Sequence, residues 1–196
     1  MNKKNIKQHF NNNYKYLAKR YDGYDAKEIH ANWISNVNFQ GLKILELGSG
    51  SGRDALFYAE NGAEVIAIDS SSKMIEFAKD KDHLNSVSWI VDELPDLISL
   101  KSNNQFDLIT ATAVLMFLSP ADQILSLKRF RELLNCGGRV IITFKEDIED
   151  IHAYLLSPNF MEAAKSLGFK ITLKNGGKDK NGRVGVSWKL FIFSLV

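Results

Sequence analysis

The sequence predicts an α/β fold with a mostly parallel sheet of seven strands, the last of which runs antiparallel. Short apolar runs alternate with helical segments along most of the chain, which is typical of parallel sheets covered by helices. A run of glycines joins the first apolar run to a helix. A glycine-rich hairpin precedes the last apolar run, and two strands joined by a hairpin must be antiparallel.

The composition is that of an ordinary globular protein. The 196 residues are 45% hydrophobic and 24% charged, enough for one domain with a sizeable core. The net charge of +2 gives no reason to expect a nucleic-acid or membrane partner. Because Cys136 is the single cysteine and the N-terminus lacks the apolar run of a signal peptide, we expect a cytoplasmic protein.

Residues 1–40 are predicted to form a helical segment ahead of the sheet. Its first helix, Met1 to Arg20, carries apolar residues three or four positions apart and many basic residues without an acid. A turn at residues 21–25 leads to a second helix, Ala26 to Val37, for which Asp25 is the expected cap. We expect this segment to be a lid over a domain spanning residues 41–196.

The first strand and the turn after it predict a nucleotide site. Lys43–Leu47 is a short apolar run with Glu46 near its end, and Gly48, Gly50 and Gly52 follow. Glycines let a ligand approach the main chain closely, and Asp54 opens a helix whose free N–H groups face the same space. The second apolar run, residues 65–68, ends at Asp69, about 20 residues beyond the glycines, where a ribose-binding carboxylate is expected.

Two other nucleotide sites fit less well. A nicotinamide fingerprint requires a small residue where this chain has Arg53. A phosphate-binding Walker loop requires Gly-Lys-Ser or Gly-Lys-Thr, which the turn lacks.

The rest of the chain continues the alternation of helices and strands. Ser70–Ser72 offers caps to a helix ending near Lys79, Pro120 opens a helix to about Leu134 that ends through Gly137 and Gly138, and a further helix runs from Ser157 to Gly168. The later strands are expected at 87–91, 106–111, 139–144, 169–173 and 186–195.

The segments ILELGSGSG, VIAIDSSSKMIEFAK and VDELPDL resemble the first three motifs of class I S-adenosylmethionine-dependent methyltransferases. The resemblance covers roughly residues 41–196 and is closest to small bacterial enzymes that act on small molecules. It implies a Rossmann-like, doubly wound sheet and S-adenosylmethionine as cofactor, with S-adenosylhomocysteine as product. In that family the first motif holds the methionine moiety, Asp69 would hold the ribose hydroxyls and Asp92 the adenine amino group.

The implied cofactor residues are Glu46, Leu47, Gly48, Ser49, Gly50, Gly52, Arg53, Asp54, Asp69, Ser70, Met74, Asp92, Glu93, Leu94, Ala111, Thr112 and Ala113. Met74 fits a contact with adenine and an ordinary core position equally well. The candidate substrate residues are Tyr14, Tyr21, Tyr24, Met116, Phe117 and Trp188. An aromatic side chain between a helix and the core is also a common packing residue.

The sequence does not identify a catalytic residue or a metal site. Methyl transfer from a sulfonium is an in-line displacement that needs alignment and exclusion of water more than a base. Relatives often carry His after the fourth strand, where this chain has Phe117. The four histidines, His9, His30, His83 and His152, are expected on the surface.

The acceptor is expected to be a small molecule. Nucleic-acid amino methyltransferases carry Asn/Asp-Pro-Pro-aromatic after the fourth strand, where this chain has residues 110–113, Thr-Ala-Thr-Ala. Two alternatives remain open: an RNA or protein methyltransferase that uses the basic N-terminal helix, and a non-catalytic cofactor-binding module. The oligomeric state does not follow from the sequence.

Overall fold

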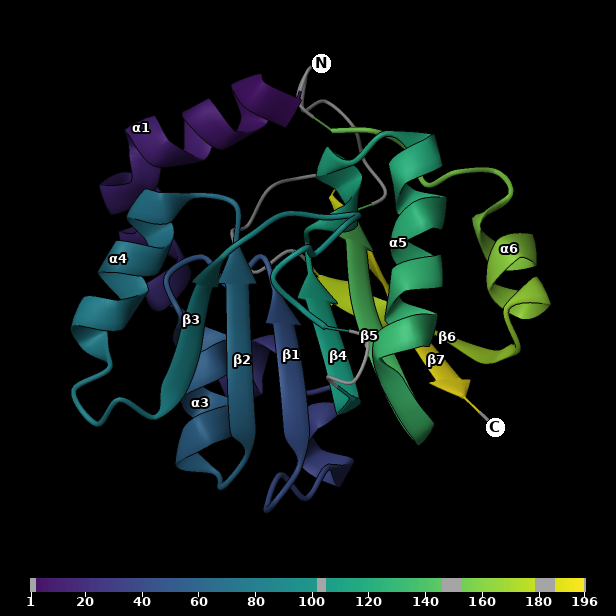
Figure 1. Ribbon diagram of the computed structural model, residues 1–196, viewed down its shortest axis with the longest axis horizontal. Coiled ribbons are helices and arrows are strands. Elements are labelled where there is room, and N and C mark those ends of the chain that lie inside the picture. Colours follow the sequence, from purple (N-terminus) through teal and green to yellow (C-terminus); the bar gives the residue numbers. More distant parts are fainter. Residues whose placement is uncertain (1–2, 102–104, 146–152, 179–185, 196) are drawn as a thin grey trace. The chain divides into compact units, whose positions relative to one another are not determined.

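The computed structural model describes residues 3–101, 105–145, 153–178 and 186–195. The chain divides into two compact units, residues 1–93 and 94–196. The strands form one seven-stranded sheet in the order β3-β2-β1-β4-β5-β7-β6 (Figure 1). This order, with its antiparallel end, confirms the predicted fold class.

The first unit is a parallel three-stranded sheet with helices between its strands. β1 pairs in parallel with β2, and β2 pairs in parallel with β3. The carboxyl ends of the strands are level, because Leu47 lies opposite Ile68 and Asp69 opposite Val91. Its elements are α1 (Lys3–Asp22), α2 (Ala26–Ile29), η1 (Ile34–Asn36), β1 (Lys43–Leu47), α3 (Arg53–Glu60), β2 (Glu64–Asp69), α4 (Ser72–Lys81) and β3 (Val87–Val91).

The N-terminal helices pack onto this unit through an apolar cluster. α1 lies beside α4 (Figure 1), and Leu17, Ala18 and Met74 form a buried cluster between them. Asp25 caps α2 by accepting a hydrogen bond from the backbone N–H of Lys27 at 2.7 Å, as expected. The prediction of one helix over residues 26–37 was wrong, because α2 ends at Ile29 and only the short 3-10 turn η1 follows.

The second unit carries the antiparallel end of the sheet. β4 pairs in parallel with β5, whereas β7 pairs antiparallel with both β5 and β6. Ser119 caps α5, whose first residue is Pro120, as the sequence predicts. The elements are β4 (Phe106–Thr112), η2 (Leu115–Phe117), α5 (Pro120–Leu133), β5 (Leu134–Lys145), α6 (Phe160–Ser166), β6 (Phe169–Lys178) and β7 (Ser187–Leu195).

The predicted glycine end of α5 was wrong. Leu134 is already extended and begins β5 directly, so the helix ends without a left-handed glycine. The register of β4 on β5 steps from Leu134 to Arg139, which leaves residues 135–138 as a bulge in β5. Gly137 has its positive φ of 76° inside this bulge, next to the exposed Cys136.

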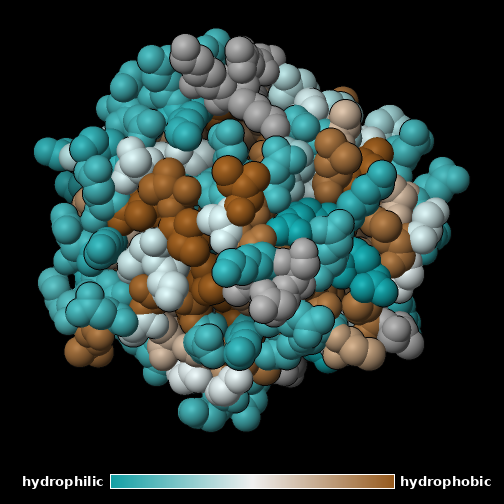
Figure 2. Space-filling view, in the orientation of Figure 1, coloured by the Kyte–Doolittle hydropathy of each residue, from teal (hydrophilic) through white to brown (hydrophobic). Residues whose placement is uncertain are grey.

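Hydrophilic side chains cover most of the face drawn in Figure 2, and hydrophobic ones form separate patches between them. The exposed large hydrophobic residues come from different elements, such as Tyr16 of α1, Leu125 of α5 and Leu173 of β6. Within the described ranges, every helix is too short or too polar to cross a bilayer.

Candidate functional site

The glycine turn after β1 is the centre of the candidate site. Gly48, Gly50 and Gly52 all have positive φ, at 66°, 53° and 80°. A Cβ on Gly52 would lie 2.7 Å from the ring of Trp89, so that glycine is required by packing inside the unit. The atoms nearest to a Cβ on Gly50 would be in the ring of Tyr21, at 3.3 Å and 3.4 Å. Of Gly50 and Gly52, Gly50 is therefore the one with a side chain of the N-terminal segment, that of Tyr21, next to its main chain.

Asp69 fixes the glycine turn to the end of β2. Its Oδ2 accepts a hydrogen bond from the backbone N–H of Gly50 at 2.9 Å, and its Oδ1 accepts one from Ser71 at 2.8 Å. Each carboxylate oxygen has a second lone pair, so both can also accept from a ligand hydroxyl. Burial raises the pKa of Asp69, although the two backbone bonds oppose that rise. The structure thus brings together the two residues that the sequence placed at one ligand.

Two buried oxygen atoms beside the turn have no partner among the described residues. They are Oε2 of Glu46, at the end of β1, and Oγ of Ser49, within the turn. Buried polar atoms are nearly always hydrogen-bonded in folded proteins. A ligand that brings hydrogen-bond donors to the turn, such as an ammonium group, would satisfy both of them.

Glu46 predicts a pH dependence of stability. Burial, reinforced by the charge of Asp54, raises the pKa of Glu46 well above 4.5, although Arg53 acts in the opposite direction. The folded protein therefore holds this proton more tightly than the unfolded chain, so its contribution to stability is complete below pH 4.5 and is lost as the pH rises through the folded pKa.

The side chain of Glu46→Gln is an amide, which does not titrate in this pH range. We expect the free energy of unfolding of the wild type, relative to that of Glu46→Gln, to fall as the pH rises from about 4 to about 7. Urea titrations at several pH values measure this difference. A difference that stays constant with pH contradicts the assignment.

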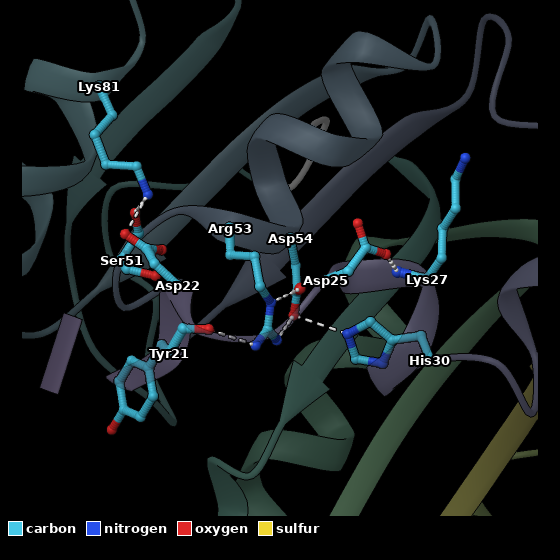
Figure 3. A network of polar contacts seen from close by, with 9 residues as sticks. All are labelled: Tyr21, Asp22, Asp25, Lys27, His30, Ser51, Arg53, Asp54 and Lys81. Carbon is cyan, nitrogen blue, oxygen red and sulfur yellow. Dashed lines mark hydrogen bonds and ion pairs between the residues drawn. The ribbon is translucent and has the colours of Figure 1, made fainter. Parts of the chain in front are cut away.

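Arg53, Asp54 and His30 form a buried network at the start of α3 (Figure 3). Arg53 donates to both carboxylate oxygens of Asp54, from Nε at 2.6 Å and from Nη2 at 2.9 Å. Nε2 of His30 lies 2.8 Å from Oδ2 of Asp54. Burial alone would raise the pKa of Asp54, but the charges and hydrogen bonds of His30 and Arg53 outweigh it and hold that pKa well below its usual range.

The expected surface position of His30 was wrong, because its side chain is only 1% exposed. His30 is the C-cap residue of α2. Its ring lies between Asp54 and Trp33, whose ring centroid is 5.4 Å away. His9 and His83 are exposed as expected, and His152 lies outside the described residues. The sequence offers no signal for the His30–Asp54 contact, which joins residues 24 positions apart.

The residues after β2 serve the packing of α4. Ser71 caps α4 through the backbone N–H of Met74 at 3.2 Å, whereas Ser70 is half-buried. Met74 is completely buried in the cluster with Leu17 and Ala18. Of the two interpretations of Met74, the structure supports the core position.

The acidic pair after β3 also lies at this edge of the first unit. The backbone N–H of Asp92 donates to the carbonyl of Asp69 at 3.2 Å, which brings the β2 and β3 ends together. The Asp92 side chain is half-buried and accepts from the N–H of Glu93 at 2.7 Å. Leu47 is buried at the end of β1.

The aromatic candidates of the N-terminal segment differ in position. Tyr14 and Tyr21 pack against the cluster that contains Met74, and Tyr21 also reaches Gly50. Tyr24 is half-buried in the turn between α1 and α2. Packing thus accounts for Tyr14, while the ring of Tyr21 is the one beside the glycine turn.

The remaining candidates lie in the second unit. Ala111 is buried near the end of β4, Thr112 ends that strand, and Ala113 has a positive φ of 57° with its N–H donating to Oγ1 of Thr143 at 3.0 Å. A non-glycine residue in this conformation is strained, and such strain often accompanies binding sites. The others are Leu94 and Met116, both buried, and Phe117 and Trp188, both half-buried.

The family model that matches the chain is "Tellurite resistance protein TehB", over residues 10–165. A probable S-adenosyl-L-methionine-dependent methyltransferase TehB of Haemophilus influenzae is 28% identical over 69% of this chain and 46% of that protein. A malonyl-[acyl-carrier protein] O-methyltransferase of Priestia megaterium is 32% identical over 74% of this chain and 53% of that protein. The chain thus spans about half the length of these curated relatives.

Solved structures show the same fold. A magnesium protoporphyrin IX methyltransferase of Synechocystis, crystallised with S-adenosylhomocysteine, aligns with a TM-score of 0.74 at 17% identity and covers 97% of this chain and 98% of that one. A TehB-like methyltransferase of Corynebacterium glutamicum aligns with a TM-score of 0.68 at 22% identity, covering 97% and 98% of the two chains. The family match, over most of the chain, and these folds agree with the resemblance in the first three motifs. The chain therefore belongs to the TehB family of class I S-adenosylmethionine-dependent methyltransferases.

Proposed function

We propose that this chain transfers a methyl group from S-adenosylmethionine to a small-molecule acceptor. The single observation that carries the donor half is the carboxylate of Asp69, which is half-buried at the end of β2 and accepts a hydrogen bond from the main chain of Gly50 in the glycine turn. The reducing cytoplasm expected from the single cysteine is compatible with this activity.

The residues of the first unit fit the donor. Both oxygens of Asp69 can accept from the two ribose hydroxyls, and Glu46 and Ser49 offer buried acceptors to the amino group of the methionine moiety. Asp92, at the neighbouring strand end, is proposed to meet the adenine edge. When bound, the donor supplies an electrophilic methyl group on a sulfonium. The residues of the chain need only align the acceptor with this methyl group and exclude water.

The second part of the proposal concerns the residues that bind the methyl acceptor. We propose that Met116, Phe117 and Trp188 contribute to the acceptor side, and that residues 1–40 act as a lid that carries Tyr14, Tyr21 and Tyr24. Ala111, Thr112 and Ala113 are proposed to contact the cofactor. The names of similar proteins include acceptors as different as phosphoethanolamine and magnesium protoporphyrin IX. The similarity therefore supports the donor more strongly than any particular acceptor.

Two measurements test the proposal in order. Calorimetry should first show binding of S-adenosylmethionine and S-adenosylhomocysteine to the purified chain. A screen of small metabolites for formation of S-adenosylhomocysteine should then identify an acceptor, with Asp69→Ala as the background control. Failure to bind either compound contradicts the proposal, and binding without turnover on any metabolite supports a macromolecular acceptor or a non-catalytic module.

Gly50→Val is expected to weaken donor binding at least tenfold, or about 1.4 kcal/mol. The added Cβ would occupy the space between the turn and the ring of Tyr21, 3.3 Å away, at a φ of 53° that valine rarely adopts. Calorimetry with S-adenosylhomocysteine measures the loss.

Gly41→Val is the matched control for this variant. Gly41 also has a positive φ, 76°, but nothing lies within 4 Å of its added Cβ. In Gly41→Val the positive φ should therefore destabilise the fold about as much as in Gly50→Val, while the donor affinity should be normal. Equal affinities of the two variants would make the glycine turn purely structural.

A further inference from the structure

Three polar links join the N-terminal segment to the donor side of the first unit (Figure 3). The carbonyl of Tyr21 accepts from Nη1 of Arg53 at 3.1 Å, and His30 reaches Asp54 at 2.8 Å. Nζ of Lys81 donates to Oδ2 of Asp22 at 2.7 Å and to the carbonyl of Ser51, within the glycine turn, at 3.1 Å. The family motifs account for none of these links.

Two of the three links fall on the last two residues of α1, Tyr21 and Asp22. The carbonyls at a helix C-terminus have no partner within the helix, and that end carries a partial negative charge, so a cation placed there is stabilising. Arg53 fills this position for Tyr21, and Lys81 pairs with the next residue, Asp22. Arg53 is committed to Asp54 with its other nitrogen atoms, so its guanidinium is held in one place.

The position of Tyr21 places its ring next to the glycine turn. In Figure 3 its carbonyl points toward Arg53 and its ring points away from it. That ring is the group next to Gly50, and the guanidinium of Arg20 lies 5.3 Å from its centroid. Any movement of the end of α1 therefore moves the ring relative to the main chain of the turn.

We propose that Arg53 and Lys81 are positioning residues that fasten Tyr21 and Asp22 to the glycine turn, and that this fastening slows release of the methyl donor. The inference rests on the proposed function for the identity of the ligand. The fastening itself is a property of the chain alone. Lys81 acts on the ligand through Asp22, Ser51 and Tyr21.

Lys81→Met is the sharpest probe of this fastening. The side chains of Lys81 and Asp22 are 33% and 30% exposed, and the loss of such a partly exposed ion pair should leave the fold intact. We expect the dissociation rate of S-adenosylhomocysteine to rise about threefold to tenfold, the range for loss of a partly exposed ion pair together with a charged hydrogen bond. Stopped-flow tryptophan fluorescence measures this rate. At about 1 M salt, where the screening length is about 3 Å, the difference from wild type should shrink.

Two further variants separate positioning from general structure. Lys79→Met removes a neighbouring exposed lysine of α4 and should behave as wild type. In the Tyr21→Leu background the effect of Lys81→Met should become smaller, because residues that act through one another are not additive. Hydrogen exchange without ligand should be faster in residues 16–22 of Lys81→Met and unchanged in β1 and β2.

The outcomes are distinct. Wild-type protein that binds neither donor nor product contradicts the proposed function. Wild-type binding with the same dissociation rate in Lys81→Met and Lys79→Met overturns the fastening alone, as does an equal effect of Lys81→Met with and without Tyr21. Asp22→Asn, which removes the charge from the other side of the pair, should reproduce the faster dissociation, and a normal rate in that variant also overturns it.

Discussion

Asp69→Ala is expected to weaken binding of S-adenosylmethionine by about 2 to 4 kcal/mol, because hydrogen bonds to a charged group are worth about 1.5 to 3 kcal/mol each. The substitution removes the proposed acceptor of the ribose hydroxyls. It also removes the acceptor that holds the N–H of Gly50 at 2.9 Å and that of Ser71 at 2.8 Å. Calorimetry with donor and product measures the loss.

The control for Asp69→Ala is Asp80→Ala, which removes an exposed carboxylate of α4 in the same unit. Asp69→Asn should give an intermediate affinity, because an amide oxygen still accepts but carries no charge. Unchanged donor affinity in a folded Asp69→Ala protein would remove this residue from the site.

Asp54→Ala is expected to lower the free energy of unfolding by about 3 to 5 kcal/mol, the usual cost of removing one partner from a buried ion pair. The side chains of Asp54 and His30 are only 6% and 1% exposed, and that of Arg53 is 19% exposed. The variant leaves both Arg53 and His30 without their carboxylate. Urea denaturation at neutral pH measures the change.

The pH dependence gives an independent check on Asp54. Its pKa is lower in the folded protein than the ordinary 3.8, so its contribution is present above pH 3.8 and is lost as the pH falls toward the folded pKa. Wild type and Asp54→Ala should therefore converge in strong acid. Glu60→Ala, on the same helix, should have little effect, and a loss below about 1 kcal/mol in Asp54→Ala would place the network among ordinary surface pairs.

The sequence predicts those parts of the structure that depend on local patterns. The strand Val87–Val91 was predicted with the bounds it has, because its apolar run is bordered by polar residues. The contact of Asp69 with Gly50 was also predictable, since adjacent parallel strands bring their carboxyl ends to one edge. Asp25 and Ser71 were recognisable as helix caps for the same local reason.

Contacts between distant segments could not be predicted in this way. Lys81 and Asp22 are 59 residues apart, and nothing in their neighbourhoods marks them as a pair. His30 resembled a surface residue because its partner, Asp54, is set by the packing of α2 on α3. The end of α5 was misplaced because Gly137, a usual helix-ending residue, serves a bulge in β5 instead.

The arrangement at the start of α3 has a consequence for how this protein can diversify. The neighbouring residues Arg53 and Asp54 hold the two ends of the segment from Tyr21 to His30, so this segment, which contains α2, is closed at its base. The cost of closing a loop grows only slowly with its length, and exposed loop tips tolerate insertions. Gly23 is exposed in the turn between α1 and α2, so residues can be added there while Arg53 and Asp54 still hold the two ends of the segment. Under the proposed function, a longer turn here would change what reaches the proposed donor site and would leave the contacts of Arg53 and Asp54 as they are.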